Sequence, residues 1–131
     1  MTNDGFFRIA AATPEIRPAD CEFNRASMLA LARECASRRV GAVVFPELCL
    51  TGYTCGDLFR DRTLLAGAER ALGELMDGTK DLPLLVLAGL PVPLGAELYN
   101  CAAVFTGGKL LGLAAKTFLP NYCEFYEARH F

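Results

Sequence analysis

Two charged side chains directly follow apolar segments, and they are the strongest candidates for chemistry in the sequence. Glu47 comes after the apolar run 42–45 and Pro46, which predicts a position just beyond the carboxyl end of a buried strand. Open α/β sheets form their ligand crevices at this edge, where a carboxylate can act as a general base. The alternative is an exposed glutamate in an ordinary loop.

Lys116 is the second candidate, at the end of the apolar segment 110–115. The glycine pair 107–108 predicts a two-residue hairpin turn between strands 98–106 and 109–115, because both glycines can take a positive φ. Lys116 would then leave the sheet at the open end of the hairpin. An ammonium group there could stabilise an oxyanion. The alternative is a strand-end lysine whose stem packs on the sheet while its charge reaches water.

The glycine turn also predicts a register for the hairpin. If the two residues that flank the turn pair with each other, Tyr99 lies opposite Lys116 and Asn100 lies opposite Ala115. Under this register, the cross-strand neighbour of the candidate lysine is a tyrosine.

The segment 117–131 combines a turn signal, Pro120-Asn121, with many aromatic rings and two acids. The aromatic residues are Tyr122, Phe125, Tyr126 and Phe131, and the acids are Glu124 and Glu127. Such a density of rings in a loop predicts a pocket wall or an interface. Ordinary packing is the alternative.

Hydrophobic periodicity predicts the elements that must hold these candidates. Met28, Leu31, Ala32 and Cys35 follow helical spacing, for example, and Gly41 is predicted to close that helix. The predicted elements are strand 7–12, helix 20–39, strand 42–45, helix 60–77, strand 84–89, a turn at 91–97, and strands 98–106 and 109–115. The order βαβαβ followed by a β-hairpin predicts an α/β fold with helices on one or both faces of a sheet.

Composition indicates a globular chain that acts on a small metabolite or another protein. The 131 residues suit one domain, and 53% of them are apolar against 21% charged. The net charge of −2 and the absence of a basic stripe argue against nucleic acid or an anionic membrane as partner. The apolar runs are too short to span a membrane, and Arg8 interrupts the one near the N-terminus, which is unlike a signal peptide. We therefore expect a cytoplasmic protein.

Six cysteines are many for this length, but the sequence predicts no metal site. None of them forms a CxxC pair, and only one histidine, His130, could join them. In a reducing compartment such cysteines are most often small buried hydrophobes, and we expect packing roles for all six, including Cys49 and Cys123 near the two candidates.

Together these features resemble the nitrilase superfamily of carbon–nitrogen hydrolases. FPELCLTGY is similar to the segment that carries the family's catalytic glutamate, and YNCAAVF, the glycine turn and GLAAK are similar to the strand pair before its lysine. The resemblance implies a Glu-Lys-Cys triad on an α-β-β-α sandwich, with Glu47 as the base and Lys116 as the lysine.

Within that superfamily, KTFLPNYCEFYEARHF and GYTCGDLF resemble the glutaminase domains of NAD synthetases, and the likeness extends over residues 7–131. It implies that glutamine is hydrolysed to glutamate and ammonia by a cysteine nucleophile. It further implies that Tyr122 contacts glutamine and that Glu127 is a structural glutamate near the triad.

The resemblance also implies missing parts. The family's nucleophilic cysteine lies downstream of the lysine block, and the synthetase half would bind ATP, with Mg²⁺, and deamido-NAD. We therefore expect residues 1–131 to be an incomplete, N-terminal piece of a glutaminase domain that needs no cofactor and is inactive alone. Half of a sandwich leaves an apolar sheet face open, which predicts self-association or cover by the rest of the synthetase chain.

Two other interpretations stay open at this point. One is another hydrolase of the same superfamily, acting on a nitrile, amide or carbamoyl group. The other is a noncatalytic interaction module that keeps the fold, in which case Glu47 and Lys116 would lie apart or point to solvent.

Overall fold

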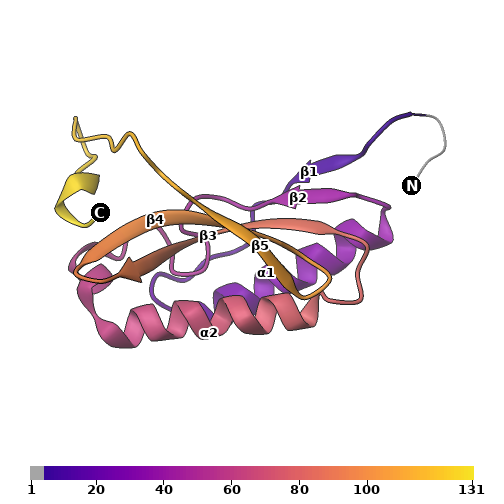
Figure 1. The fold of residues 1–131 in the computed structure, drawn as a ribbon, viewed down its shortest axis with the longest axis horizontal. Helices are drawn as coiled ribbons and strands as arrows, with labels where there is room; N and C mark the ends of the chain where they lie inside the picture. Colours follow the sequence, from indigo (N-terminus) through magenta and orange to yellow (C-terminus); the bar gives the residue numbers. More distant parts are fainter. Residues whose placement is uncertain (1–4) are drawn as a thin grey trace.

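The computed structural model describes residues 5–131, which form one five-stranded sheet with two long helices against it (Figure 1). The elements are β1 (Ile9–Ala11), α1 (Cys21–Ser37), β2 (Ala42–Val44), the 3-10 helix η1 (Gly56–Arg60), α2 (Arg62–Gly78), β3 (Leu85–Leu94), β4 (Glu97–Thr106), β5 (Lys109–Ala115) and the 3-10 helix η2 (Glu127–Arg129). The strands lie in the order β1-β2-β3-β4-β5; β1, β2 and β3 are parallel, and β4 and β5 continue antiparallel. The predicted βαβαβ order and β-hairpin are confirmed.

Both helices lie side by side on one face of the sheet and pack their buried residues into the core with those of the strands (Figure 1). Each begins at an aspartate: Asp20 accepts from the backbone N–H of Phe23, and Asp61 caps α2 in the same way. The end of α1 differs from the prediction. The left-handed turn is taken by Arg39, with φ 59°, and Gly41 instead leaves room for the ring of Phe7.

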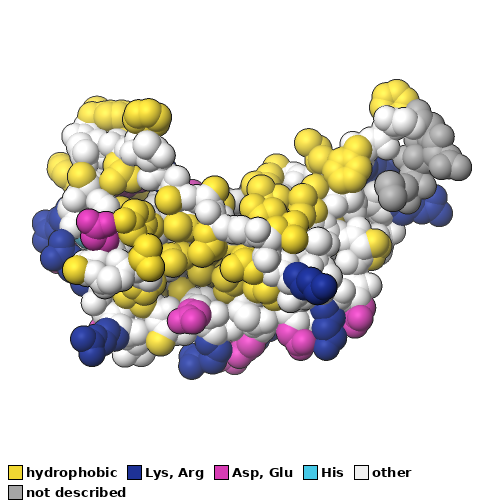
Figure 2. All heavy atoms as spheres, viewed as in Figure 1, with side chains coloured by type: hydrophobic (Ala, Val, Ile, Leu, Met, Phe, Trp, Pro, Cys, Tyr) yellow, Lys and Arg dark blue, Asp and Glu magenta, His cyan; other side chains and the backbone are white. Residues whose placement is uncertain are grey.

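The opposite face of the sheet carries exposed apolar side chains within residues 5–131. Val44 in β2 is 45% exposed, so the prediction that this strand is buried is wrong for its outer face. Every residue of β5 is exposed. Leu113 pairs with the buried Ala103 and therefore lies on the helix side, which shows that the helices do not reach over this edge strand. Figure 2 shows hydrophobic side chains gathered across the middle of the molecule, where Figure 1 has β3, β4 and β5.

β3 runs through the segment that was predicted to be a turn. It passes Pro91 and Pro93 and ends at Leu94, so the true turn is only two residues long, with Gly95 at φ 63°. The carbonyls of Leu87 and Gly89 accept hydrogen bonds on the side away from β4. By the two-residue repeat of a strand, both prolines place their ring nitrogens on that same side, where no ladder donor is needed.

The β4–β5 hairpin follows the predicted register near its turn and departs from it further on. Gly107 and Gly108 take φ 57° and 73°, and Thr106 pairs with Lys109 as expected. Phe105 still pairs with Leu110, and a β-bulge between Phe105 and Val104 then shifts the register by one residue, so that Cys101 faces Ala115. The backbone N–H of Lys116 consequently donates to the carbonyl of Asn100 at 2.8 Å, which corrects the predicted pairing of Tyr99 with the lysine.

Across the part of the chain that the structure describes, neither long helix is apolar and long enough to cross a membrane.

Candidate active site

Glu47 is presented at the carboxyl edge of the sheet by a tight crossing of its segment over β3. The next residue, Leu48, takes the left-handed φ of 52° and is buried, which is unusual for a leucine and costs backbone energy. Beneath the crossing lies Gly89, where an added Cβ would stand 2.4 Å from the backbone nitrogen of Leu48. The N–H of Leu50 then donates to the carbonyl of Gly89 at 3.1 Å and fixes the crossing.

Lys116 meets Glu47 at this edge, as the resemblance implied. Its Nζ lies 2.8 Å from Oε1 of Glu47 and 2.9 Å from Oε1 of Glu127. The side chains of Lys116 and Glu47 are 31% and 40% exposed, whereas that of Glu127 is 5% exposed. The ammonium group is thus held between two carboxylates, one of them buried and the other open to a ligand.

This arrangement keeps Lys116 charged. Burial acts to lower the pKa of its ammonium group, but hydrogen bonds to Glu47 and Glu127 and the charges of both carboxylates outweigh burial and raise the pKa above its ordinary value. A lysine with a raised pKa is a poor proton acceptor at neutral pH and a good partner for a developing negative charge.

Tyr53, from the loop between Glu47 and η1, supports Glu127 from the other side. Its hydroxyl donates to Oε2 of Glu127 at 2.8 Å. Burial, the hydrogen bond to Glu127 and the nearby negative charges raise the pKa of Tyr53 to about 12, so it stays a donor well above neutral pH. Sequence reasoning did not single out Tyr53, although it lies in the same GYTCGD segment that carried the family resemblance.

Asn100 is the second residue that sequence reasoning missed. It is 5% exposed, and its Nδ2 donates to Oε1 of Glu47. The predicted register placed Asn100 one residue away from Lys116, and only the bulge in the hairpin brings it beside the lysine. A lone asparagine among apolar strand residues was the signal that could have found it, because a buried amide needs hydrogen-bond partners.

Tyr122 does not touch the two candidates. It is 66% exposed, and its ring packs edge-on against Phe125 at 5.6 Å between centroids. Phe125 in turn packs against Tyr53 at 6.4 Å, so Tyr122 joins the site through an aromatic chain and not by direct contact. The predicted pocket wall holds in part, since Tyr126 and Phe131 line a cavity of about 220 Å³ together with Glu127.

The cysteines divide by burial. Cys21, Cys35, Cys49, Cys55 and Cys101 are buried, as expected for packing residues. Cys123 is exposed, so its predicted packing role is wrong; it lies in an irregular loop at φ 53°. Burial raises the pKa of Cys49 to about 12, which keeps it a thiol at neutral pH.

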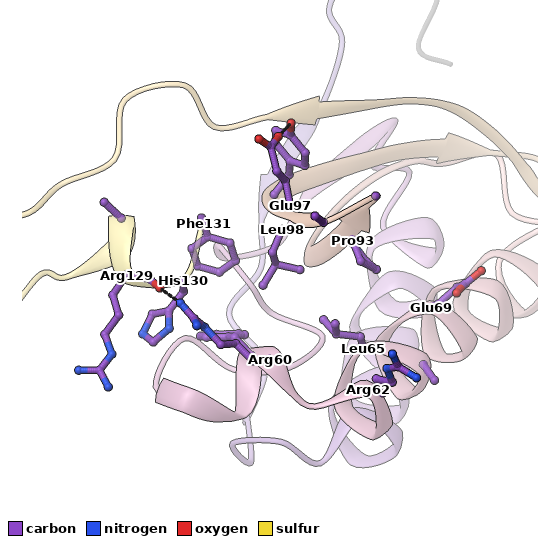
Figure 3. Close-up of a pocket in the computed structure, with 16 residues that line it drawn as sticks. Arg60, Arg62, Leu65, Glu69, Pro93, Glu97, Leu98, Arg129, His130 and Phe131 are labelled. Carbon is purple, nitrogen blue, oxygen red and sulfur yellow. Dashed lines mark hydrogen bonds between the residues drawn. The ribbon is translucent and has the colours of Figure 1, made fainter.

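A large hollow lies away from this chemistry. A cavity of about 960 Å³ lies between α2, the β3–β4 turn and the C-terminal segment, and none of Glu47, Lys116 or Glu127 lines it (Figure 3). Figure 3 shows Glu97 and Leu98 on one side and Arg60, which donates to the carbonyl of Arg129 at 2.6 Å, on another. The candidate site is therefore defined by its charged cluster and not by the size of a cavity.

The chain belongs to the carbon–nitrogen hydrolase family, whose profile matches residues 8–131. It is 38% identical over 127 residues to the glutamine-dependent NAD(+) synthetase of Mycobacterium leprae, covering 97% of this chain and 19% of that protein. The synthetase of Mycobacterium tuberculosis is 39% identical over 125 residues, covering 95% and 18%. The chain thus spans about a fifth of the length of the curated relatives it matches.

Solved structures agree with the fold. The crystal structure of a glutamine-dependent NAD(+) synthetase from Cytophaga hutchinsonii matches with a TM-score of 0.90 at 33% identity, covering 95% of this chain and 21% of that one. An amidase from Nesterenkonia sp. matches with a TM-score of 0.73 at 22% identity, covering 87% and 44%, which supports the fold alone. The predicted nitrilase-like α/β class is confirmed.

Proposed function

We propose that these residues form the first part of a glutaminase domain, which hydrolyses glutamine and supplies ammonia to a synthetase that amidates deamido-NAD. The observation that carries the proposal is the contact of 2.8 Å between Lys116 and Glu47, two residues 69 positions apart in sequence. The NAD synthetase relatives, which align along nearly the whole chain, favour this substrate over a nitrile or carbamoyl group.

In the proposed reaction, Glu47 is the general base and Lys116 stabilises the oxyanion. The amide carbon of glutamine is a poor electrophile, so a thiol must lose its proton to a base within about 3 Å as it attacks. Glu47 accepts that proton and later returns it to the departing ammonia. The protonated Lys116 lies beside Glu47 and can stabilise the negative charge on the tetrahedral intermediate.

Two further residues have supporting roles in the proposal. Glu127 and Tyr53 hold Lys116 in place, because the buried carboxylate binds the ammonium and the tyrosine hydroxyl binds the carboxylate. Tyr122 would contact glutamine only as part of the exposed aromatic rim, since it does not touch Glu47 or Lys116.

The nucleophile is proposed to come from sequence beyond these residues. Cys49 is 2% exposed and its raised pKa keeps it protonated, while no contact joins Cys123 to Glu47 or Lys116 within residues 5–131. We use "full-length parent" for the complete protein that would supply the cysteine and the synthetase domain. In that protein, ATP with Mg²⁺ would act in the synthetase domain, and residues 1–131 alone would be inactive.

The rest of the synthetase chain is the proposed partner of the open sheet face, where Val44 is exposed and Leu87 and Val104 are half-buried. Homo-oligomerisation is part of the same proposal. So is a cytoplasmic location, since ATP and NAD precursors are substrates of the cell interior.

Glutamine hydrolysis by the full-length parent tests the proposal, with Glu47→Gln as the key variant. Losing a general base typically costs 10²–10⁴-fold in rate, so we expect turnover to fall by at least about 100-fold. Formation of NAD from added ammonia should stay unchanged, because ammonia bypasses the glutaminase site. Undiminished glutamine turnover in the variant would refute Glu47 as the base. The noncatalytic alternative is disfavoured, since it required Glu47 and Lys116 to lie apart.

A further inference from the structure

Asn100 contacts both members of the Glu47–Lys116 pair but has no role in the chemistry proposed above. It lies in β4, between the strand that Glu47 crosses and the strand that Lys116 follows. Its Nδ2 donates to Oε1 of Glu47, and its backbone carbonyl accepts from the N–H of Lys116 at 2.8 Å. One buried residue therefore ties the acid to the backbone that carries the cation.

These contacts treat the two oxygens of Glu47 differently. Asn100 and Lys116 both donate to Oε1. Among residues 5–131, Oε2 accepts no hydrogen bond, and the side chain is 40% exposed. A carboxylate held through one oxygen offers the other, in a fixed direction, to whatever enters the site.

We propose that Asn100 is a positioning residue that fixes the carboxylate of Glu47, so that Oε2 is the oxygen that accepts the proton of the attacking thiol. The inference rests on the proposed function and adds to it the atom that acts as the base. A neutral amide suits this task, because it orients the carboxylate without adding a second positive charge beside Lys116.

The test compares three variants of the full-length parent: Asn100→Ala, the isosteric Asn100→Asp, and Asn24→Ala as a control. Asn24 is also a fully buried asparagine, with its side chain bonded to the backbone of Arg17 and Leu50 and not to Glu47. Both kcat and KM for glutamine are measured for each variant, and a thermal melt reports the fraction of folded protein.

Asn100→Ala should lower kcat/KM for glutamine about 10- to 100-fold, the usual effect of losing one hydrogen bond to a charged group, with KM changed less than about threefold. The loss should fall on kcat, because without the amide the carboxylate of Glu47 is no longer fixed with Oε2 toward the thiol. Asn100→Asp should lower kcat as well, since an ionised aspartate has no donor for Oε1. Asn24→Ala should lower the thermal midpoint and leave kcat in place.

Glu47→Gln is run beside these variants, so that the two proposals fail in different ways. If Glu47→Gln keeps full glutamine turnover, the proposed function itself is wrong. If Glu47→Gln is inactive while both Asn100 variants keep the wild-type kcat per folded molecule, the assignment of Asn100 is overturned. A fall in kcat in Asn24→Ala as large as that in Asn100→Ala would overturn it as well, since loosened packing would then explain both.

Discussion

Replacing Gly89 by alanine should displace the general base without touching any charged group. The new Cβ would stand 2.4 Å from the backbone nitrogen of Leu48 and 3.0 Å from the carbonyl carbon of Glu47, whereas ordinary contact begins at 3.4 Å. The neighbouring atoms belong to the backbone and cannot rotate away as a side chain could. The Glu47 segment must therefore move by about 1.0 Å, the difference between 2.4 and 3.4 Å.

A displacement of this size has two measurable effects in the full-length parent. Misplacement of a catalytic group by about 1 Å can cost about 100-fold in rate, and overpacking of a tight contact costs about 1–3 kcal/mol of stability. We expect Gly89→Ala to lower kcat for glutamine by about 100-fold and to reduce the unfolding free energy by about 2 kcal/mol. The unfolding transition of the variant should stay cooperative and lie above the assay temperature, which separates a moved base from an unfolded domain.

Gly73 provides the matched control, because it is exposed in α2 and an added Cβ would meet nothing within 4 Å. Gly73→Ala should leave glutamine hydrolysis unchanged and stabilise the protein by about 0.5–1 kcal/mol, the usual gain for this exchange in a helix. On this reasoning, Glu47 keeps its position because Gly89 in β3 has no side chain. Full glutaminase activity of Gly89→Ala at wild-type stability would contradict it.

Two further predictions concern groups around the site. Tyr53→Phe removes the hydrogen-bond donor to Glu127 and should lower the free energy of unfolding by about 1 kcal/mol at neutral pH. Because the pKa of Tyr53 is raised to about 12, this contribution is full below pH about 10, the ordinary tyrosine pKa, and is lost as pH rises toward 12. Denaturant titrations of the wild type and of Tyr53→Phe between pH 7 and 12 measure the difference in their free energies of unfolding. A difference that stays constant up to pH 12 would contradict the raised pKa of Tyr53. In native protein at pH 8, iodoacetamide should modify Cys123 and leave Cys49 intact, because Cys49 is buried with its pKa raised to about 12. Peptide mapping by mass spectrometry reads this out, and equal labelling of the two cysteines would show that Cys49 is accessible.

The order of elements could be predicted from the sequence because each depends on local patterns. Helical spacing around Met28 gave α1 to within two residues at its end, and paired glycines gave the β4–β5 turn. The extent of β3 was missed because prolines usually end a strand, and Pro91 and Pro93 are tolerated only on the side without ladder donors. Which side that is depends on tertiary pairing and is not encoded nearby in sequence.

The candidate site was predictable in its charges and not in its supports. Glu47 and Lys116 each end an apolar run, and such a position is visible in one segment read alone. Asn100 contacts Glu47, which lies 53 positions away, and Tyr53 contacts Glu127, which lies 74 positions away. The partner of each residue therefore could not be predicted from a local pattern.

The bulge between β4 and β5 decides how these parts meet. Side chains alternate between the faces of a strand, so a shift of one residue moves a side chain to the opposite face. In the unbulged register, Lys116 would pair with Tyr99 and share its face, away from Asn100. The extra residue in β5 instead aligns Lys116 with Asn100, whose side chain already reaches Glu47. One inserted residue thus brings the cation and the acid to the same face of the sheet, where both can act on one substrate.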